Sequence, residues 1–198
     1  MKNITLIIPL LLSVFSFGQE SHKKDEFRNK GYFNITRFSY INTNVVERET
    51  FTPESGIVVT DLSAENSRAF TLQTINGYFI SPYFSLGVGF GLDGYHNPDI
   101  NTMPLFLDVR AYLNNNYDSP FIALDLGTLV KIEPELRQGR TFQASAGYKL
   151  FIEREKRIAL IADIGYTYKS ISFDGNSIRN SEDFYQLNGL SLSLGIIF

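Results

Sequence analysis

Residues 190–198 read Leu-Ser-Leu-Ser-Leu-Gly-Ile-Ile-Phe. Leucine or isoleucine alternates with serine or glycine as far as residue 196, which is the pattern of a β-strand with one apolar face and one small, polar face. Only Ile197 breaks the alternation. The stretch therefore predicts a strand in a sheet whose two faces meet different environments.

Seven earlier segments share this two-residue period, and turn-forming pieces separate them. The eight segments predicted as strands are 31–41, 70–80, 83–93, 103–113, 121–131, 141–152, 157–169 and 185–198. In the first segment, Phe33 and Ile35 lie on the parity opposite to Phe38. We therefore expect a β-bulge near Thr36 or Arg37, which would bring these apolar residues to one face.

The connections between these segments alternate in length. Short connections at 81–82, 114–119 and 153–156 alternate with longer ones at 42–69, 94–102, 132–140 and 170–184. Outer-membrane barrels have short periplasmic turns and longer external loops, and an even number of strands puts both chain ends on the periplasmic side. The order of lengths predicts an all-β, eight-stranded, antiparallel, up-and-down transmembrane β-barrel.

The composition of the polar face decides which face points outward. No Glu occurs within a predicted strand, and every glycine of the second to eighth strands falls on the polar face: Gly77, Gly87, Gly89, Gly91, Gly127, Gly147, Gly165, Gly189 and Gly195. A polar face with few charged residues and mostly small side chains is typical of a crowded lumen. The apolar face then contacts lipid. A soluble, lipocalin-like binding barrel, with the apolar face inside, is the alternative.

The start of the chain carries the features of an export signal. A short positive start precedes an apolar stretch from Ile4 to Phe17, and small residues end it at Ser16 and Gly18. The stretch is shorter than the roughly 20 residues of a spanning helix. We expect a signal peptide at 1–18, cleaved near Gly18, a periplasmic segment at 19–30 and the barrel at 31–198.

Charge and cysteine content exclude several classes of function. The net charge is −3, no long block of Lys and Arg occurs, and the chain has no cysteine. Nucleic acid is therefore not an expected partner, and disulfides, thiol catalysis and cysteine-bound zinc are ruled out.

The 190–198 stretch, with its terminal Phe198, resembles the C-terminal strand of bacterial outer-membrane barrels. Residues 76–87 and 104–112 also resemble strands of small OmpA-like or porin-like barrels. The resemblance covers about 31–198 and does not include the peptidoglycan-binding domain of the full OmpA pattern. It implies a Gram-negative cell outer-membrane protein whose terminal Phe198 is the signal read by the barrel-assembly machinery.

Five charged residues fall on the polar parity of neighbouring predicted strands: Asp108, Arg110, Asp125, Lys149 and Asp163. Unpaired charges in a lumen are costly, so we expect these side chains to pair with one another. Such a network would be a salt-bridge plug that holds the barrel shut, because eight strands leave room only for packed side chains. A gate or a cation path is the alternative interpretation.

No motif carries enzyme chemistry. Residues 89–94 match a dinucleotide fingerprint in spacing, but the predicted loop at His96 and Pro98 replaces the required helix. His96 lacks a second histidine nearby for a metal site, and no His and Ser pair suits nucleophilic catalysis. We expect no catalytic residue, cofactor or metal.

The expected function is that of a non-enzymatic barrel with an envelope-structural role or a surface-interaction role. Loop 42–69 is the expected place for an extracellular partner, because the apolar residues 45–46 and 56–59 stand there among charged ones. Extension of the hairpin beyond the membrane is the other interpretation of this loop. A small passive, porin-like channel is the alternative function, and outer-membrane lipid is an expected partner in either case.

Overall fold

The computed structural model describes residues 29–52, 56–114, 118–130, 136–153, 158–173 and 182–198. The expected signal peptide at 1–18, and all but the last two residues of the expected periplasmic segment at 19–30, lie outside the described residues. Within the described ranges, no helix has the length and apolar character needed to cross a membrane.

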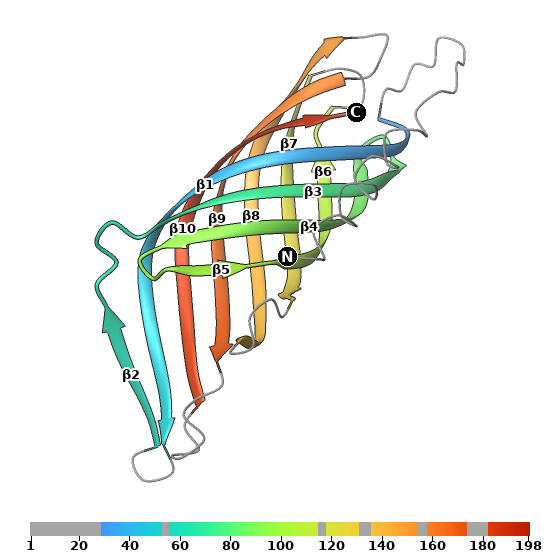
Figure 1. Ribbon diagram of the computed structural model, residues 1–198. Helices are drawn as coiled ribbons and strands as arrows, with labels where there is room; N and C mark the ends of the chain where they lie inside the picture. The colour runs from blue at the N-terminus through green and yellow to red at the C-terminus, as the bar shows by residue number, and fades with distance from the viewer. Residues whose placement is uncertain (1–28, 53–55, 115–117, 131–135, 154–157, 174–181) are drawn as a thin grey trace, which may run out of the picture.

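Eight strands form a closed antiparallel ring (Figure 1). In ring order they are β1 (Gly31–Thr52), β3 (Arg68–Ser81), β4 (Phe84–His96), β6 (Pro104–Tyr112), β7 (Ser119–Leu129), β8 (Leu136–Glu153), β9 (Ile158–Phe173) and β10 (Glu182–Ile197). Pairing of β10 with β1 closes the ring. The predicted eight-stranded barrel is confirmed, and each predicted segment corresponds to one of its strands.

Two further strands add to this ring at one end. β2 (Gly56–Leu62) pairs with the last part of β1, and β5 (Ile100–Thr102) pairs with the last part of β4. We call this end, which carries the long connections, the loop end, and the opposite end, where Pro82 and Tyr83 link β3 to β4, the turn end. At the loop end several strands outrun their predicted bounds, and within 42–69 β1 and β2 form a hairpin that continues past the pairing of β1 with β3.

The bulky apolar side chains point away from the ring. Along β4, half-exposed side chains such as Leu86 and Val88 alternate with buried positions such as Ser85. On β10, Leu192 is 59% exposed whereas Ser193 is fully buried. The predicted assignment of faces is confirmed, and a soluble barrel that encloses its apolar face is excluded.

The bulge predicted near Thr36 or Arg37 is wrong. The register of β1 against β3 is continuous from Gly31 to Asn42. The irregularity in β1 lies further along, between Thr43 and Val45, in its pairing with β10. Phe33 and Ile35 simply point inward. They break the apolar-outside pattern because the lumen contains an apolar layer of its own.

Glycine makes room for that inner layer. A Cβ atom on Gly89 would lie 2.3 Å from the Phe106 ring of the neighbouring strand. A Cβ on Gly127 would lie 2.2 Å from the Leu105 carbonyl oxygen, where backbone cannot easily yield. Gly89, like Gly77 and Gly147, therefore leaves space for an inward aromatic ring of another strand, and Gly127 allows close approach of the neighbouring backbone.

Candidate functional site

Side chains fill the lumen in three layers along the barrel axis. Nearest the turn end is an apolar layer of Phe33, Ile35, Ile75, Phe79, Phe106, Tyr112, Phe121, Ala123, Ala159, Ile161 and Ile197. Nearest the loop end is a second apolar layer of Ile41, Val46, Ala69, Tyr95, Leu129, Ile171 and Leu187. Arg37, Asp125 and Asp163 lie between these two layers along β1, β7 and β9, and Asp108 and Arg110 adjoin them on β6, between Phe106 and Tyr112. We call these five residues and the buried polar side chains around them the charged layer.

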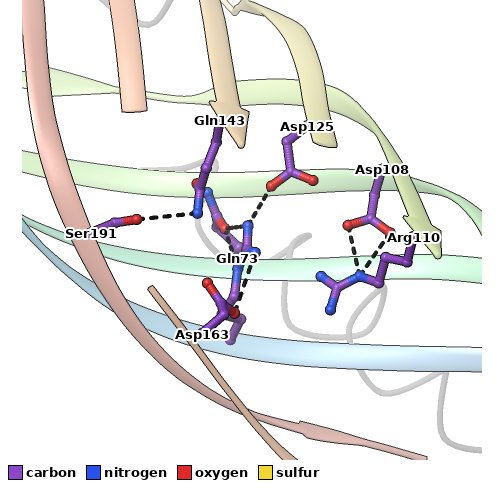
Figure 2. Close-up of polar contacts among 8 residues, drawn as sticks. Gln73, Asp108, Arg110, Asp125, Gln143, Asp163 and Ser191 are labelled. Atoms are coloured by element: carbon purple, nitrogen blue, oxygen red, sulfur yellow. Dashed lines mark hydrogen bonds and ion pairs between the residues drawn. The ribbon is translucent and has the colours of Figure 1, made fainter. Parts of the chain in front are cut away.

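Arg37 is the centre of the charged layer. Its Nε and Nη2 donate to Gln73 Oε1 at 2.9 and 2.5 Å, and Nη2 also donates to Asp125 Oδ2 at 2.6 Å. Its Nη1 lies 3.9 Å from Asp163 Oδ2. Figure 2 shows these carboxylates and Gln73 converging on one guanidinium. One cation thus faces carboxylates from two strands, β7 and β9.

The bond from Arg37 to Asp125 crosses the lumen. Going one way round the ring from β1, the strands are β3, β4, β6 and then β7; going the other way they are β10, β9, β8 and then β7. β7, which carries Asp125, therefore lies opposite β1. The contact ties the two walls of the barrel together.

Asp108 and Arg110 form a second pair in the charged layer. Arg110 Nε donates to the two carboxylate oxygens of Asp108 at 3.0 and 2.9 Å, and both side chains are fully buried. The Arg110 guanidinium also stands over the Phe121 ring, with 5.2 Å from its Cζ to the ring centroid. The register places Asp108 directly beside Asp125. The two arginines therefore hold adjacent carboxylates.

A separate tie crosses the lumen toward the loop end. Lys169 of β9 donates to Asp93 of β4, which lies on the opposite side of the ring, and Thr102 Oγ1 donates to the same Asp93 oxygen at 2.7 Å. The Lys169 ammonium lies 5.0 Å from the centroid of the Tyr95 ring. This ion pair stands at the level of the loop-end apolar layer.

Lys149 lies near the turn end, away from the acidic residues of the charged layer. Its ammonium donates to the side-chain oxygen of Asn29 and lies 4.7 Å from the Tyr112 ring centroid. The Asn29 amide donates in turn to the carbonyls of Pro82 at 2.8 Å and Asn114 at 3.4 Å. Asn29 therefore joins two turns and one strand across the mouth of the barrel.

We expect Asn29→Ala to lower the stability of the barrel by about 1–3 kcal/mol, because it removes the polar partner of a buried ammonium and two hydrogen bonds to turn carbonyls. Urea unfolding in phospholipid vesicles, followed by far-UV circular dichroism, measures this. Asn29→Asp keeps an acceptor for Lys149 and is the matched control, with a smaller loss. An Ala variant as stable as the parent would contradict this role for Asn29.

The five charged residues singled out in the sequence are all buried in the lumen. Asp108 contacts Arg110, and Asp125 and Asp163 meet at Arg37, while Lys149 lies apart from them. Sequence reasoning missed the hub residue, Arg37, because the misplaced bulge left its direction open. The signal available was the unbroken alternation of Arg37 with Phe38 and Tyr40, which places the arginine inside.

A closed antiparallel ring of eight strands, apolar outside and filled inside, is the architecture of a small transmembrane β-barrel of the outer membrane. The outer membrane protein OprG of Pseudomonas aeruginosa has a similar crystal structure, with a TM-score of 0.58 and 10% sequence identity over 87% of this chain and 97% of OprG. The outer membrane protein AlkL, solved by solid-state NMR in DMPC bilayers, is similar with a TM-score of 0.52 and 13% identity over 91% of this chain and 94% of AlkL.

No family model matches the chain, and no curated protein matches it in sequence. The expected resemblance to small outer-membrane barrels is therefore confirmed at the level of the fold. Barrels can share this fold at low sequence identity, because many different apolar side chains can cover the lipid-facing side. Packing constrains only the side chains that point inward.

Proposed function

We propose that the protein is a non-enzymatic outer-membrane barrel that is exported by a cleaved signal peptide and has no open channel. In this proposal its work is done at the loop end, outside the cell, as an envelope-structural or surface-interaction protein. The apolar outer face contacts outer-membrane lipid.

The layered filling of the lumen is the observation that supports this most directly. Along β1, β7 and β9 the charged residues lie between the two apolar layers, and both arginines of the charged layer are fully buried. Water and small solutes would have to pass side chains packed from opposite walls. The same packing argues against an enzyme site inside the barrel, because a substrate could not reach the buried acidic groups.

Phe198 supports the proposed route of assembly. Its backbone exchanges two hydrogen bonds with Asn34, at 2.7 and 3.0 Å, where the last strand meets the first. Its side chain is 41% exposed on the outer face. We propose that the assembly machinery reads this last strand before β10 and β1 close the ring.

The absence of a channel is tested in planar lipid bilayers. We expect the purified protein to give negligible conductance at neutral pH. A variant with Arg37, Phe106 and Phe121 all replaced by alanine, which empties part of each of the two layers nearest the turn end, is the comparison and is expected to leak. Steady ohmic steps from the parent protein would overturn the proposal and favour the passive channel.

A further inference from the structure

β2 presents one unpaired edge. One of its edges pairs with β1, from Val46↔Leu62 to Thr52↔Gly56. On the other side, no strand among the described residues pairs with it. Strand β3 pairs with the part of β1 that is nearer the turn end and begins only at Arg68. Its partner β4 ends at His96. The backbone groups of the outer β2 edge are therefore available to a new strand.

This edge lacks the usual protection against pairing. Proteins blunt free edges with Lys, Pro or a bulge. Residues 56–62 contain neither Lys nor Pro, their one charged residue is Asp61, and their register against β1 is unbroken. The strand is exposed on both faces, with Ile57 at 69% on one face and Val58 at 46% on the other. An apolar, unprotected edge of seven residues is suited to strand addition.

The hairpin that carries this edge is held in place. The part of β1 that pairs with β2 also pairs with β10 on its other side, from Val46↔Leu187 onward. Gln186 Nε2 of β10 donates to Glu49 Oε1 of β1 at 2.7 Å. Figure 1 shows β2 beside the far end of β1, beyond the body of the barrel. A preorganised edge binds a strand with less loss of conformational entropy.

The charges beside the edge indicate what kind of strand fits. Glu47 of β1 and Asp61 of β2 stand directly opposite each other. Like charges in this position destabilise a strand pair. Among the described residues, no ion pair to either carboxylate is formed. Side chains alternate between the faces of a strand, so Asp61 shares its face with Val59 and Ile57. A basic residue beside Asp61 would relieve the repulsion.

We propose that β2 binds an extended peptide segment of another protein by β-strand addition at its free edge. The segment carries Lys or Arg opposite Asp61 and apolar side chains opposite Val59 and Ile57. Backbone hydrogen bonds supply the attachment, and the alternating side chains supply the selectivity. The inference rests on the proposed function in one respect, namely that the loop end faces the outside of the cell.

A second copy in the same membrane does not fit this edge. The β1–β2 hairpin continues the barrel wall, and all copies in one membrane point the same way. Antiparallel pairing of two β2 strands would turn one barrel upside down relative to the other. An occupant that pairs antiparallel, as the strands of this sheet do, is therefore a segment of a different protein.

The test uses the full mature chain in lipid nanodiscs and a fluorescent probe peptide, Lys-Thr-Val-Thr-Ile-Thr, which is complementary to residues 61 to 56 when antiparallel. We expect fluorescence anisotropy to show binding that is about two- to fivefold tighter than for the same peptide with Glu in place of Lys, the range expected for one cross-strand ion pair. A peptide with Pro between Val and Ile should lose binding, because proline cannot donate a backbone hydrogen bond.

Protein variants locate the binding to this edge. Asp61→Lys should reverse the preference, so that the Glu peptide binds more tightly than the Lys peptide. Val59→Lys should weaken both peptides. Asp99→Lys makes the same charge change in an exposed loop outside β2 and should leave the preference unchanged. A heat-dependent shift in gel mobility establishes that each variant is folded.

Equal affinities for the Lys and Glu peptides, no binding of either, or an unchanged preference in Asp61→Lys would overturn the proposed strand addition. Conductance and the accessibility of a tag between Thr52 and Gly56 to antibody on intact cells report on the proposed function separately. If the protein gave no conductance, its tag were accessible and no peptide bound, only the inference about β2 would be contradicted. An inaccessible tag would remove the external placement on which it rests.

Discussion

Arg37→Met is expected to destabilise the barrel by about 3–5 kcal/mol, the cost of leaving buried charges without their partner. The guanidinium is fully buried, and the carboxylates of Asp125 and Asp163 that it faces are 6% and 0% exposed. Methionine has a comparable length and no charge, so the packing volume changes little. The loss of stability in Arg37→Met then measures the contribution of charge and hydrogen bonding.

The measurement is urea unfolding in phospholipid vesicles, followed by far-UV circular dichroism because the chain has no Trp. The triple variant Arg37→Met with Asp125→Asn and Asp163→Asn removes the stranded charges together with the cation. We expect it to recover most of the lost stability, because a buried ion network replaced by neutral groups is often close to neutral. If the single variant were as stable as the parent, the charged layer would not hold the walls together.

Leu192→Arg is the second large effect, with an expected loss of about 2–4 kcal/mol in the free energy of unfolding, the cost of a lipid-facing arginine near the bilayer midplane. Leu192 lies on the outer face of β10, between Ile164 of β9 and Tyr40 of β1. Its inward neighbours in sequence, Ser191 and Ser193, lie beside the charged layer, because Gln143 donates to Ser191 and Ser193 stands directly opposite Asp163. The arginine would be held in hydrocarbon.

Val58→Arg is the matched control for this experiment. Val58 is also an exposed apolar residue on a strand, at 46% exposure, but it belongs to the β1–β2 hairpin beyond the ring. We expect its loss of stability to stay within about 0.5 kcal/mol, as for ordinary surface substitutions. Equal losses at the two positions would contradict the placement of the membrane around the ring, and so would a negligible loss at Leu192.

The direction of most side chains could be predicted from the sequence because it is a local property. Successive residues of a strand point to opposite faces, so the alternation in 190–198 or 84–92 assigns each residue to a face without knowledge of its neighbours. The small size of the polar set then identified that face as the inside. Asp108, Arg110, Asp125, Lys149 and Asp163 were placed in the lumen by this argument alone.

The exceptions to the alternation had a common cause that only the closed ring reveals. Phe33, Ile35 and Ile197 break the alternation of 31–41 and 190–198, and Ile161 does the same in 157–169. All four lie on the inward parity. In the structure they meet in the turn-end apolar layer. Because they come from three strands, no local pattern could indicate that they share one cluster.

The sequence by itself determined that eight strands alternate between an apolar and a small, polar face, and the barrel follows from that. Only the tertiary structure decided which inward groups meet. Arg37 and Asp125 are 88 residues apart and lie on opposite walls. Their contact depends on ring closure and on the stagger of every strand pair between them. Alternation specifies whether each side chain points inward or outward, but not its position along the barrel axis. Two side chains can meet across the lumen only when both point inward and both lie at the same position along that axis.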